Sequence, residues 1–463
     1  MSPQTWILTA PIAPTLARMA APNVIAMFIM FATSAAEAWY VGQLGIAALA
    51  GLALVFPLFM LTTMLSAGSI GGAVAGAVAQ RLGADDREGA ETLALHAFVL
   101  ALAAAALMAA VFIGFGEAIF TRLGGRGAVL QHALGYSTLL FGGGVALWLA
   151  NILSSIVRAA GQMKVAARAM VAGSLTQIAT GYLLVFGVGP LPAMGIRGAA
   201  LAVVLGFGFS ALLQAVYLLR GRGGIRLRLR GIAIEGRHFV TLLRTGLLAS
   251  ISPVSSVATV IVITGFVARL GEEALAGYGI GSRLEFLLIP MIFGIGAASI
   301  TMVGVHFGAG QEDRGHRVAW TAAIGAAVIT GTVGGTVALF PGLWADLFTQ
   351  AESVRQICRD YLRIAGPAYG FFGLGLCLYF SSQGVRKPLW PVLAGVLRLT
   401  VIAVGGSILV SGGAVEPKSL FWLIAAGMVV YGVASALAVK FGAWRSRPAK
   451  AAAGATALVG NSR

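Results

Sequence analysis

The sequence predicts an all-α polytopic membrane protein with twelve transmembrane helices. We expect two six-helix halves related by pseudo-twofold symmetry along the membrane normal. Three observations predict this fold: an apolar composition, twelve long apolar runs, and loops that recur in the second half. Of the 463 residues, 58% are hydrophobic and only 10% are charged, whereas a soluble domain usually has about 25% charged residues. Such a chain has too little polar surface to cover a water-soluble globule.

Each apolar run of about 20 residues or more is long enough to cross a bilayer as a helix. Four prolines, Pro57, Pro253, Pro290 and Pro367, lie inside or at the edges of these runs. They predict bends, which are tolerated where neighbouring groups satisfy the freed carbonyls. We expect the helices at 19–41, 52–79, 92–115, 129–157, 169–189, 198–219, 241–268, 277–307, 318–341, 360–382, 391–411 and 419–441.

Three loop motifs occur twice, in the same order and 222 to 227 positions apart. Residues 44–51 match 270–277, residues 82–87 match 307–314, and residues 160–164 match 383–387. Because each half holds an even number of helices, both halves have the same orientation, with a binding site expected near the midplane between them. We therefore divide the chain into an N-terminal lobe (1–219), a basic cytoplasmic linker (220–240), a C-terminal lobe (241–441) and a disordered cytoplasmic tail (442–463).

The basic residues indicate topology rather than nucleic-acid binding. Lys and Arg outnumber Asp and Glu by 32 to 16, but they lie mainly between the apolar runs. With the N-terminus inside, 21 of the 32, including Arg158, fall in the cytoplasm and 8 fall outside. Cytoplasmic loops carry the excess of Lys and Arg. We expect a monomer in the cell inner membrane, with both termini cytoplasmic, lipid around it and no nucleic-acid partner.

No pattern in the sequence is typical of an enzyme. The two cysteines, Cys358 and Cys377, are too few for a disulfide framework and lack metal-site spacing. An intramembrane transferase would need an acidic cluster to hold a metal and a diphosphate, and no aspartate-rich motif lies in or beside a run. We expect no catalytic residues, no metal and no cofactor apart from a coupling ion.

Glu37 is the only acidic residue of the first apolar run, which extends well to its N-terminal side. An ionised carboxylate at that depth costs about 2.5–3.5 kcal/mol on insertion scales, and such groups usually face a cavity. Our hypothesis is that Glu37 takes up and releases a proton during transport. The alternative is a glutamate at the outer interface that reaches water and has no role.

The chain resembles the multidrug and toxic compound extrusion (MATE) family over roughly residues 15–440, and is closer to its DinF-like branch. The resemblance is carried by the acidic residue that precedes residues 40–45, and by residues 79–85, 279–283, 294–304 and 308–310. It implies a secondary active antiporter that exports organic, often cationic, compounds by alternating access, driven by H⁺ or Na⁺. The substrate would be a small organic molecule.

The resemblance also implies the site. Glu37 matches the family's ion-coupling acid, and Tyr136, Asn151 and Gln177 match the polar partners that line the N-terminal cavity, with Gln177 in place of the usual asparagine. One turn later, Gly181 stands where DinF-like members have an aspartate. Ser256 and Phe372 stand near the positions of the NorM-like carboxylates.

A site with one carboxylate favours protons over sodium, because a hard cation requires several oxygen ligands. Sodium coupling remains the alternative. Trp39 and Tyr40 are candidate substrate contacts, since cationic ligands favour aromatic faces. Arg283 and Glu285 are two apart and cannot face each other on one helix, so each is expected to pair with another helix, as a gate or a structural charge.

Two other classes of transporter share part of this pattern. A flippase for lipid-linked precursors, from the same superfamily, would need a strongly cationic central cavity, and few basic residues lie within the runs. A sugar-transporter-like fold also has twelve helices, but the repeated loops argue against it.

Overall fold

The computed structural model describes residues 3–189, 192–228, 231, 233–412, 416–442 and 444. Within them every regular element is a helix, which confirms the all-α prediction. The N-terminal half comprises α1 (Pro3–Thr9), α2 (Ile12–Gly42), α3 (Ile46–Thr63), the π-helical η1 (Met64–Ile70), α4 (Gly71–Gly83), α5 (Arg87–Arg122), α6 (Gly127–Gly142), α7 (Gly144–Ala159), α8 (Met163–Phe186) and α9 (Ile196–Leu219).

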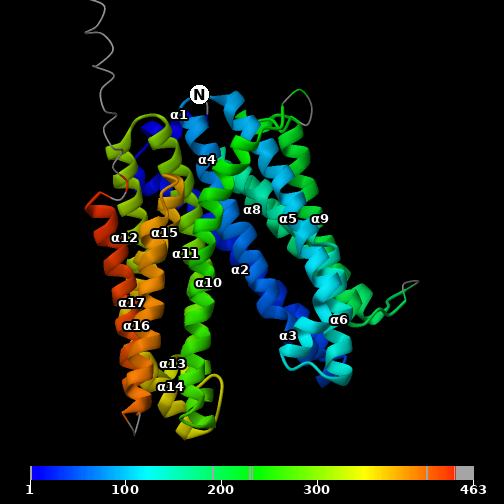
Figure 1. The fold of residues 1–463 in the computed structure, drawn as a ribbon, viewed down its shortest axis with the longest axis vertical. Coiled ribbons are helices and arrows are strands. Elements are labelled where there is room, and N and C mark those ends of the chain that lie inside the picture. The colour runs from blue at the N-terminus through cyan, green and yellow to red at the C-terminus, as the bar shows by residue number, and fades with distance from the viewer. Residues whose placement is uncertain are drawn as a thin grey trace, which may run out of the picture.

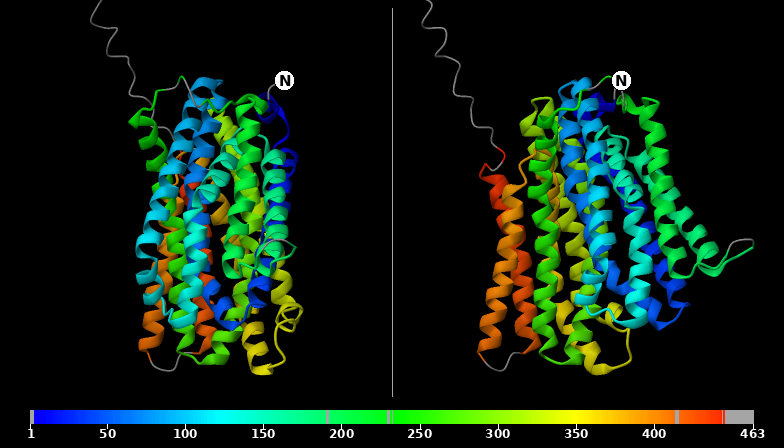
Figure 2. Two further views of the ribbon diagram at one scale, coloured as in Figure 1. Left: turned by 90° about the vertical axis from the view of Figure 1, so that its right-hand side faces the viewer. Right: turned by 45° about the vertical axis from the view of Figure 1, so that its right-hand side comes forward.

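The short 3₁₀ helix η2 (Arg222–Gly224) follows α9. The C-terminal half comprises α10 (Gly236–Ala268), α11 (Glu272–Gly308), α12 (Glu312–Leu339), α13 (Gly342–Ala345), α14 (Glu352–Ala365), the 3₁₀ turn η3 (Gly366–Ala368), α15 (Tyr369–Gly384), α16 (Leu389–Ser411) and α17 (Pro417–Lys440). Figures 1 and 2 show one elongated bundle, in which the chain begins at the top of Figure 1. We call this the N-terminal end of the bundle.

The twelve expected helices correspond to the helices observed. Among the described residues, eleven helices are long and apolar enough to cross a membrane, and α6 with α7 makes a twelfth that is bent by 48°. The fourth helix was expected to be continuous; it breaks at Gly143, which is the C-cap of α6 and the N-cap of α7. Pro57, Pro253 and Pro290 lie inside α3, α10 and α11, and Pro367 lies in η3.

The loop repeat has a backbone counterpart. Gly45 and Gly271 cap α3 and α11 with nearly the same dihedral angles, φ 109° and ψ 170° against φ 103° and ψ 171°. A positive φ near 100° is a conformation that glycine adopts without steric cost. Further along, Asp85 (φ 56°) and Gly310 (φ 73°) occupy equivalent turns after α4 and α11. These turns support the duplication inferred from the loops.

The third repeated loop was matched in the wrong register. We paired Gly161 with Gly384, but the residue that shares the turn of Gly161 (φ 79°) is Arg386 (φ 62°). The amide of Gly161 donates to the Arg158 carbonyl at 2.8 Å, and that of Arg386 donates to the Gln383 carbonyl at 2.9 Å. Gly384 instead lets α15 approach α11, because an added Cβ would lie 2.6 Å from the Ile300 carbonyl oxygen.

The two halves touch main chain to main chain near the N-terminal end of the bundle. A Cβ added at Gly83 of α4 would overlap the Val305 carbonyl of α11, and one added at Gly308 would overlap the Gln80 carbonyl. Small residues at helix interfaces allow such close approach in membranes. Toward the other end α3 and α6 stand apart from α13 and α14 (Figure 1).

Two expectations near the ends of helices need correction. Trp444, within the expected disordered tail, is fully buried, and its indole N–H donates to Ser382 Oγ at 3.1 Å; the expectation is wrong for this residue, while residues 445–463 lie outside the described part. Arg158, counted among cytoplasmic loop residues, is only 4% exposed in the last turn of α7. Helices α8 and α11 cover it.

Candidate functional site

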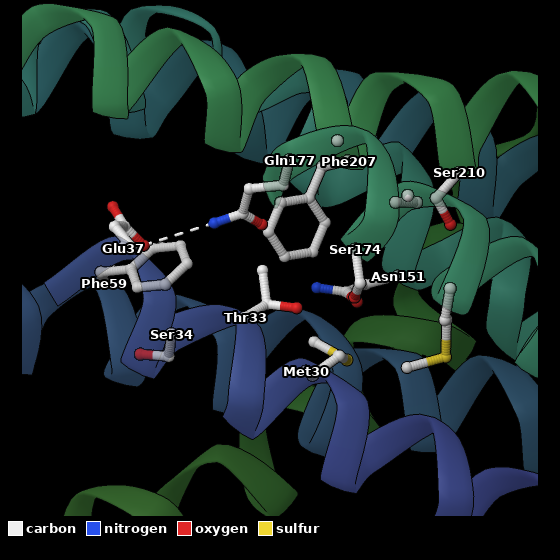
Figure 3. Close-up of a pocket in the computed structure, with 14 residues that line it drawn as sticks. Met30, Thr33, Ser34, Glu37, Phe59, Asn151, Ser174, Gln177, Phe207 and Ser210 are labelled. Carbon is white, nitrogen blue, oxygen red and sulfur yellow. Dashed lines mark hydrogen bonds between the residues drawn. The ribbon is translucent and has the colours of Figure 1, made fainter. Parts of the chain in front are cut away.

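Glu37 lies in the last turns of α2 and is 9% exposed. It lines two neighbouring cavities. The first, which we call the inner cavity, has a volume of about 70 Å³ and lies inside the N-terminal half (Figure 3). The second, the interlobe cavity, has a volume of about 540 Å³ and is bounded by α2, α3 and α6 on one side and by Arg283 of α11 on the other. Glu37 therefore borders one cavity large enough for an organic molecule and one large enough for only a few waters.

Both carboxylate oxygens of Glu37 have neutral donors. The Tyr136 hydroxyl of α6 donates to Oε1, and the Gln177 amide of α8 donates to Oε2 at 3.3 Å, as Figure 3 shows. Among the described residues, no Lys or Arg forms an ion pair with Glu37. The structure thus brings together three of the four expected side chains.

Asn151 of α7 lines the inner cavity, but its side-chain amide does not bind Glu37. The amide donates to Ser66 Oγ at 2.8 Å instead. Ser66 lies in η1, the π-helical stretch that joins α3 to α4. π-helical turns occur frequently at functional sites because they re-aim side chains. No sequence pattern indicates this turn, apart from the small residues of 66–69.

Tyr40 fills the space beside Gly181. A Cβ added at Gly181 would lie 3.1 Å from Cε2 of the Tyr40 ring, and the Tyr40 hydroxyl donates to the Ile178 carbonyl at 3.2 Å. An aspartate at position 181 would therefore compete with this ring for the same volume. The Tyr40 ring thus occupies the volume that a second carboxylate, at position 181, would need.

Trp39 and Tyr40, the expected substrate contacts, line neither of the two cavities. Trp39 is 57% exposed and its ring packs edge-on against Tyr40 and Phe186. Besides Tyr136, the aromatic residues that line the interlobe cavity are Phe31, Phe56 and Phe59. Sequence reasoning missed them, because phenylalanines are common on lipid-facing surfaces and carry no signal of their own.

Arg283 and Glu285 lie apart, as their spacing requires. The Arg283 guanidinium lines the interlobe cavity, with its carbon 5.8 Å from the centre of the Phe348 ring. Glu285 accepts a hydrogen bond from the Tyr361 hydroxyl of α14. Arg398 of α16 interacts electrostatically with Glu285 but is more than 4 Å away, since no ion pair joins them.

A comparison with solved structures supports the fold. The chain superposes on a MOP superfamily transporter from Pyrococcus furiosus with a TM-score of 0.87, at 23% identity, over 95% of this chain and 97% of that one. It superposes equally well on a MATE family transporter in an outward-facing conformation, with a TM-score of 0.86, at 24% identity, over 94% and 97% of the two chains.

Two relatives resemble the chain along most of its length. A protein named "FAD transporter" from Shewanella oneidensis is 24% identical over 409 residues, or 87% of this chain and 89% of that protein. A "Probable multidrug resistance protein NorM" from Thermotoga maritima is 26% identical over 381 residues, or 80% and 79%.

The MatE family model matches residues 22–183 and 251–409, one segment in each half. These segments make up more than half of the chain, and they contain Glu37, Tyr136, Asn151 and Gln177 in the first and Arg283 and Glu285 in the second. Proteins of this family are transporters of small molecules and not enzymes. The chain therefore belongs to the multidrug and toxic compound extrusion (MATE) family of membrane efflux transporters.

Proposed function

We propose that the protein is a secondary active antiporter that exports organic compounds in exchange for H⁺, with Glu37 as the proton-exchanging group. The observation that carries the proposal is the place of Glu37 between the inner and the interlobe cavity. A group that faces the substrate space can respond to substrate. Its polar partners can hold either protonation state, since Tyr136 donates to a carboxylate and the Gln177 amide both donates and accepts.

Proton coupling is favoured over sodium coupling by the ligands available. A sodium ion would need several oxygen ligands and negative charge. Glu37 contributes one carboxylate, both of whose oxygens already accept hydrogen bonds. No group of three or more His, Cys, Asp or Glu side chains comes together within the described residues. A proton needs only the carboxylate itself.

We infer that the substrates are organic cations with aromatic or apolar bodies. The interlobe cavity is mainly apolar, with Phe31, Phe56 and Phe59 in its wall, and about 540 Å³ suits a drug-sized molecule. A cation and a proton compete for one carboxylate, so loading of either expels the other. That competition is the linkage that an antiporter requires.

A second candidate substrate carries a negative charge. Arg283 is the one basic residue in the wall of the interlobe cavity, and the relative from Shewanella oneidensis is named for FAD, an aromatic nucleotide with phosphates. For such a substrate the linkage has the opposite sign, because a proton on Glu37 would strengthen anion binding. A flippase for lipid diphosphates is disfavoured, because one guanidinium in the cavity wall is too little positive charge to hold a diphosphate.

We propose the following setting for this cycle. The protein works as a monomer in the inner membrane, surrounded by lipid and without a nucleic-acid partner. Both termini are cytoplasmic, so the N-terminal end of the bundle faces the cytoplasm. The interlobe cavity then opens outward, and the contact between α4 and α11 is the closed inner gate.

Efflux from proteoliposomes tests the function. Purified protein is reconstituted without sodium, an inward-directed proton gradient is imposed, and release of a fluorescent lipophilic cation is compared with release of FAD. We expect the cation to be released by the parent and by Glu285→Gln, and not by Glu37→Gln. Release that follows only a sodium gradient would contradict proton coupling. Release of FAD that is driven by an outward-directed and not by an inward-directed proton gradient, and that is lost in Arg283→Ala, would select the second candidate.

A further inference from the structure

Arg158 is a buried cation without a carboxylate partner. It is 4% exposed, and none of the ion pairs among the described residues includes it. Its guanidinium donates to Ser154 Oγ at 2.8 Å and to Ser155 Oγ at 3.2 Å, and its carbon lies 5.7 Å from the centre of the Phe293 ring. Burying a charge with only neutral partners is costly, and apolar packing alone would not require a charge here.

The guanidinium lies behind one of the residues that line the inner cavity. Arg158 Nη1 lies 4.0 Å from the Met170 sulfur, and Met170 lines the same cavity as Glu37 and Asn151. A cavity of about 70 Å³ can hold a few waters. The space that begins at the Glu37 carboxyl therefore ends close to a fixed positive charge.

A polar stripe continues along α7 from that cavity to the guanidinium. Asn151 is followed one turn later by Ser154 and Ser155 and two turns later by Arg158, all on one face. Ser155 Oγ donates to the Asn151 carbonyl at 2.9 Å and accepts from Arg158. Asn151 and Arg158 are roughly 10 Å apart along the helix axis. In an apolar bundle this stripe is a route along which water and protons could pass.

We propose that Arg158 is an electrostatic barrier that stops protons from leaking past Glu37 to the cytoplasm while the inner gate is closed. This inference rests on the proposed function. A positive charge fixed in a narrow, low-dielectric passage repels protons and other cations. With an effective dielectric constant of about 20, one unit charge lowers the proton occupancy of a site about 10 Å away roughly tenfold.

The barrier lies at a second contact between the halves, where α7 packs against α11. Phe293 and Thr301 of α11 cover Arg158, and the Thr301 hydroxyl donates to the Arg158 carbonyl at 3.1 Å. When α7 and α11 separate, the guanidinium loses this cover and becomes hydrated, and water screens its field. In this conformation, in which Glu37 must give up its proton, the route from Glu37 to the cytoplasm is no longer blocked by the charge.

The test measures proton flux without substrate. Proteoliposomes hold a pH-sensitive dye, and valinomycin with K⁺ compensates charge while an inward proton gradient is imposed. We expect Arg158→Met, which keeps volume and removes charge, to raise substrate-free flux about tenfold or more over the parent. Arg158→Lys, which keeps the charge, should stay near the parent. Arg158→Met combined with Glu37→Gln should return to the parent level.

Each outcome decides the point. Parent-like flux in Arg158→Met, in a monodisperse protein, overturns the barrier, and so does an equal leak in Arg158→Lys, which would make packing the cause. If Arg158→Met does not fold, Arg158→Gln answers the same question. Substrate efflux by the parent in the same vesicles separates the two proposals, because a parent that shows no proton-driven efflux refutes the antiport and not the barrier measurement.

Discussion

Each half of the molecule contains one glutamate that accepts a hydrogen bond from a tyrosine, yet the two pairs have different surroundings. Glu37 is held by Tyr136 in the N-terminal half, and Glu285 by Tyr361 in the C-terminal half. The two tyrosines are 225 positions apart, as the repeated loops are. The glutamates are on non-equivalent helices, the first and the second of their halves.

The difference lies in charge compensation. Arg398 acts electrostatically on Glu285, is 7% exposed and lies over the Phe372 ring at 5.1 Å, so a buried base lies near the acid of the C-terminal half. Glu37 has only neutral partners and borders two cavities. A buried carboxyl with no base nearby can be neutralised only by binding a proton or a cationic substrate. A buried carboxyl near a base has less need of either.

Neutralising each acid in turn should separate the two halves most clearly. Glu37→Gln should reduce proton-driven efflux to the level of empty vesicles, because the exchanging group is gone. Glu285→Gln should retain efflux, and should lower thermal stability, since the buried Arg398 loses a nearby negative charge. Efflux assays and thermal unfolding in detergent measure the two effects. Equal loss of efflux in both variants would erase the distinction between the lobes.

Removing each tyrosine hydroxyl should give a smaller contrast. Tyr136→Phe deletes one hydrogen bond to a charge-bearing group, worth about 1.5–3 kcal/mol, and should shift the pH at which efflux is half-maximal. Tyr361→Phe should leave that pH unchanged and affect only stability. Efflux rates measured across a pH series decide this, and a shift of the same size in Tyr361→Phe would count against it.

The packing beside the N-terminal acid can be disturbed more gently. Gly181→Ala places a methyl group 3.1 Å from the Tyr40 ring, which must give way by a few tenths of an ångström. We expect unfolding free energy to fall by about 1–3 kcal/mol, as for overpacked cores. The double variant Gly181→Ala with Tyr40→Leu should recover part of the loss. No recovery would mean that Tyr40 is not the limiting neighbour.

The smallest effect is expected in the loops. Asp86 caps α5 by accepting from the Gly89 amide at 2.8 Å, whereas its counterpart Gln311 makes no side-chain cap at α12. The Gly89 amide, then Arg81, lowers the pKa of Asp86. A depressed pKa gives stability above about pH 4 that is lost as the pH falls through the folded-state value.

Asp86→Ala should therefore cost about 1 kcal/mol at pH 7 and little at pH 3. Unfolding measured at both values checks the sign. Gln311→Ala is the matched control, with no pH-dependent change expected. A loss that is larger at pH 3 than at pH 7 would rule out the cap as its cause.

The positions of the helices could be predicted because apolar length is a local property of the sequence. Breaks within them could not, because the glycines at 142–144 are equally compatible with a kink and with close packing. Gln177 lies at Glu37, but the Asn151 amide donates to Ser66, a residue of the π-helical η1 that apolar patterning does not reveal. Arg158 was misplaced since nothing local shows that Met170 and Phe293 cover it.

The contact of Gly83 and Gly308 with opposing carbonyls has a mechanical consequence. Where backbone meets backbone, no side chain interlocks, so the two helices can slide or lift apart there without passing through a strained, half-unlocked arrangement. In the cycle proposed above, the inner gate can thus close tightly at this point and reopen, because tightness here comes from proximity and not from interlocking shape.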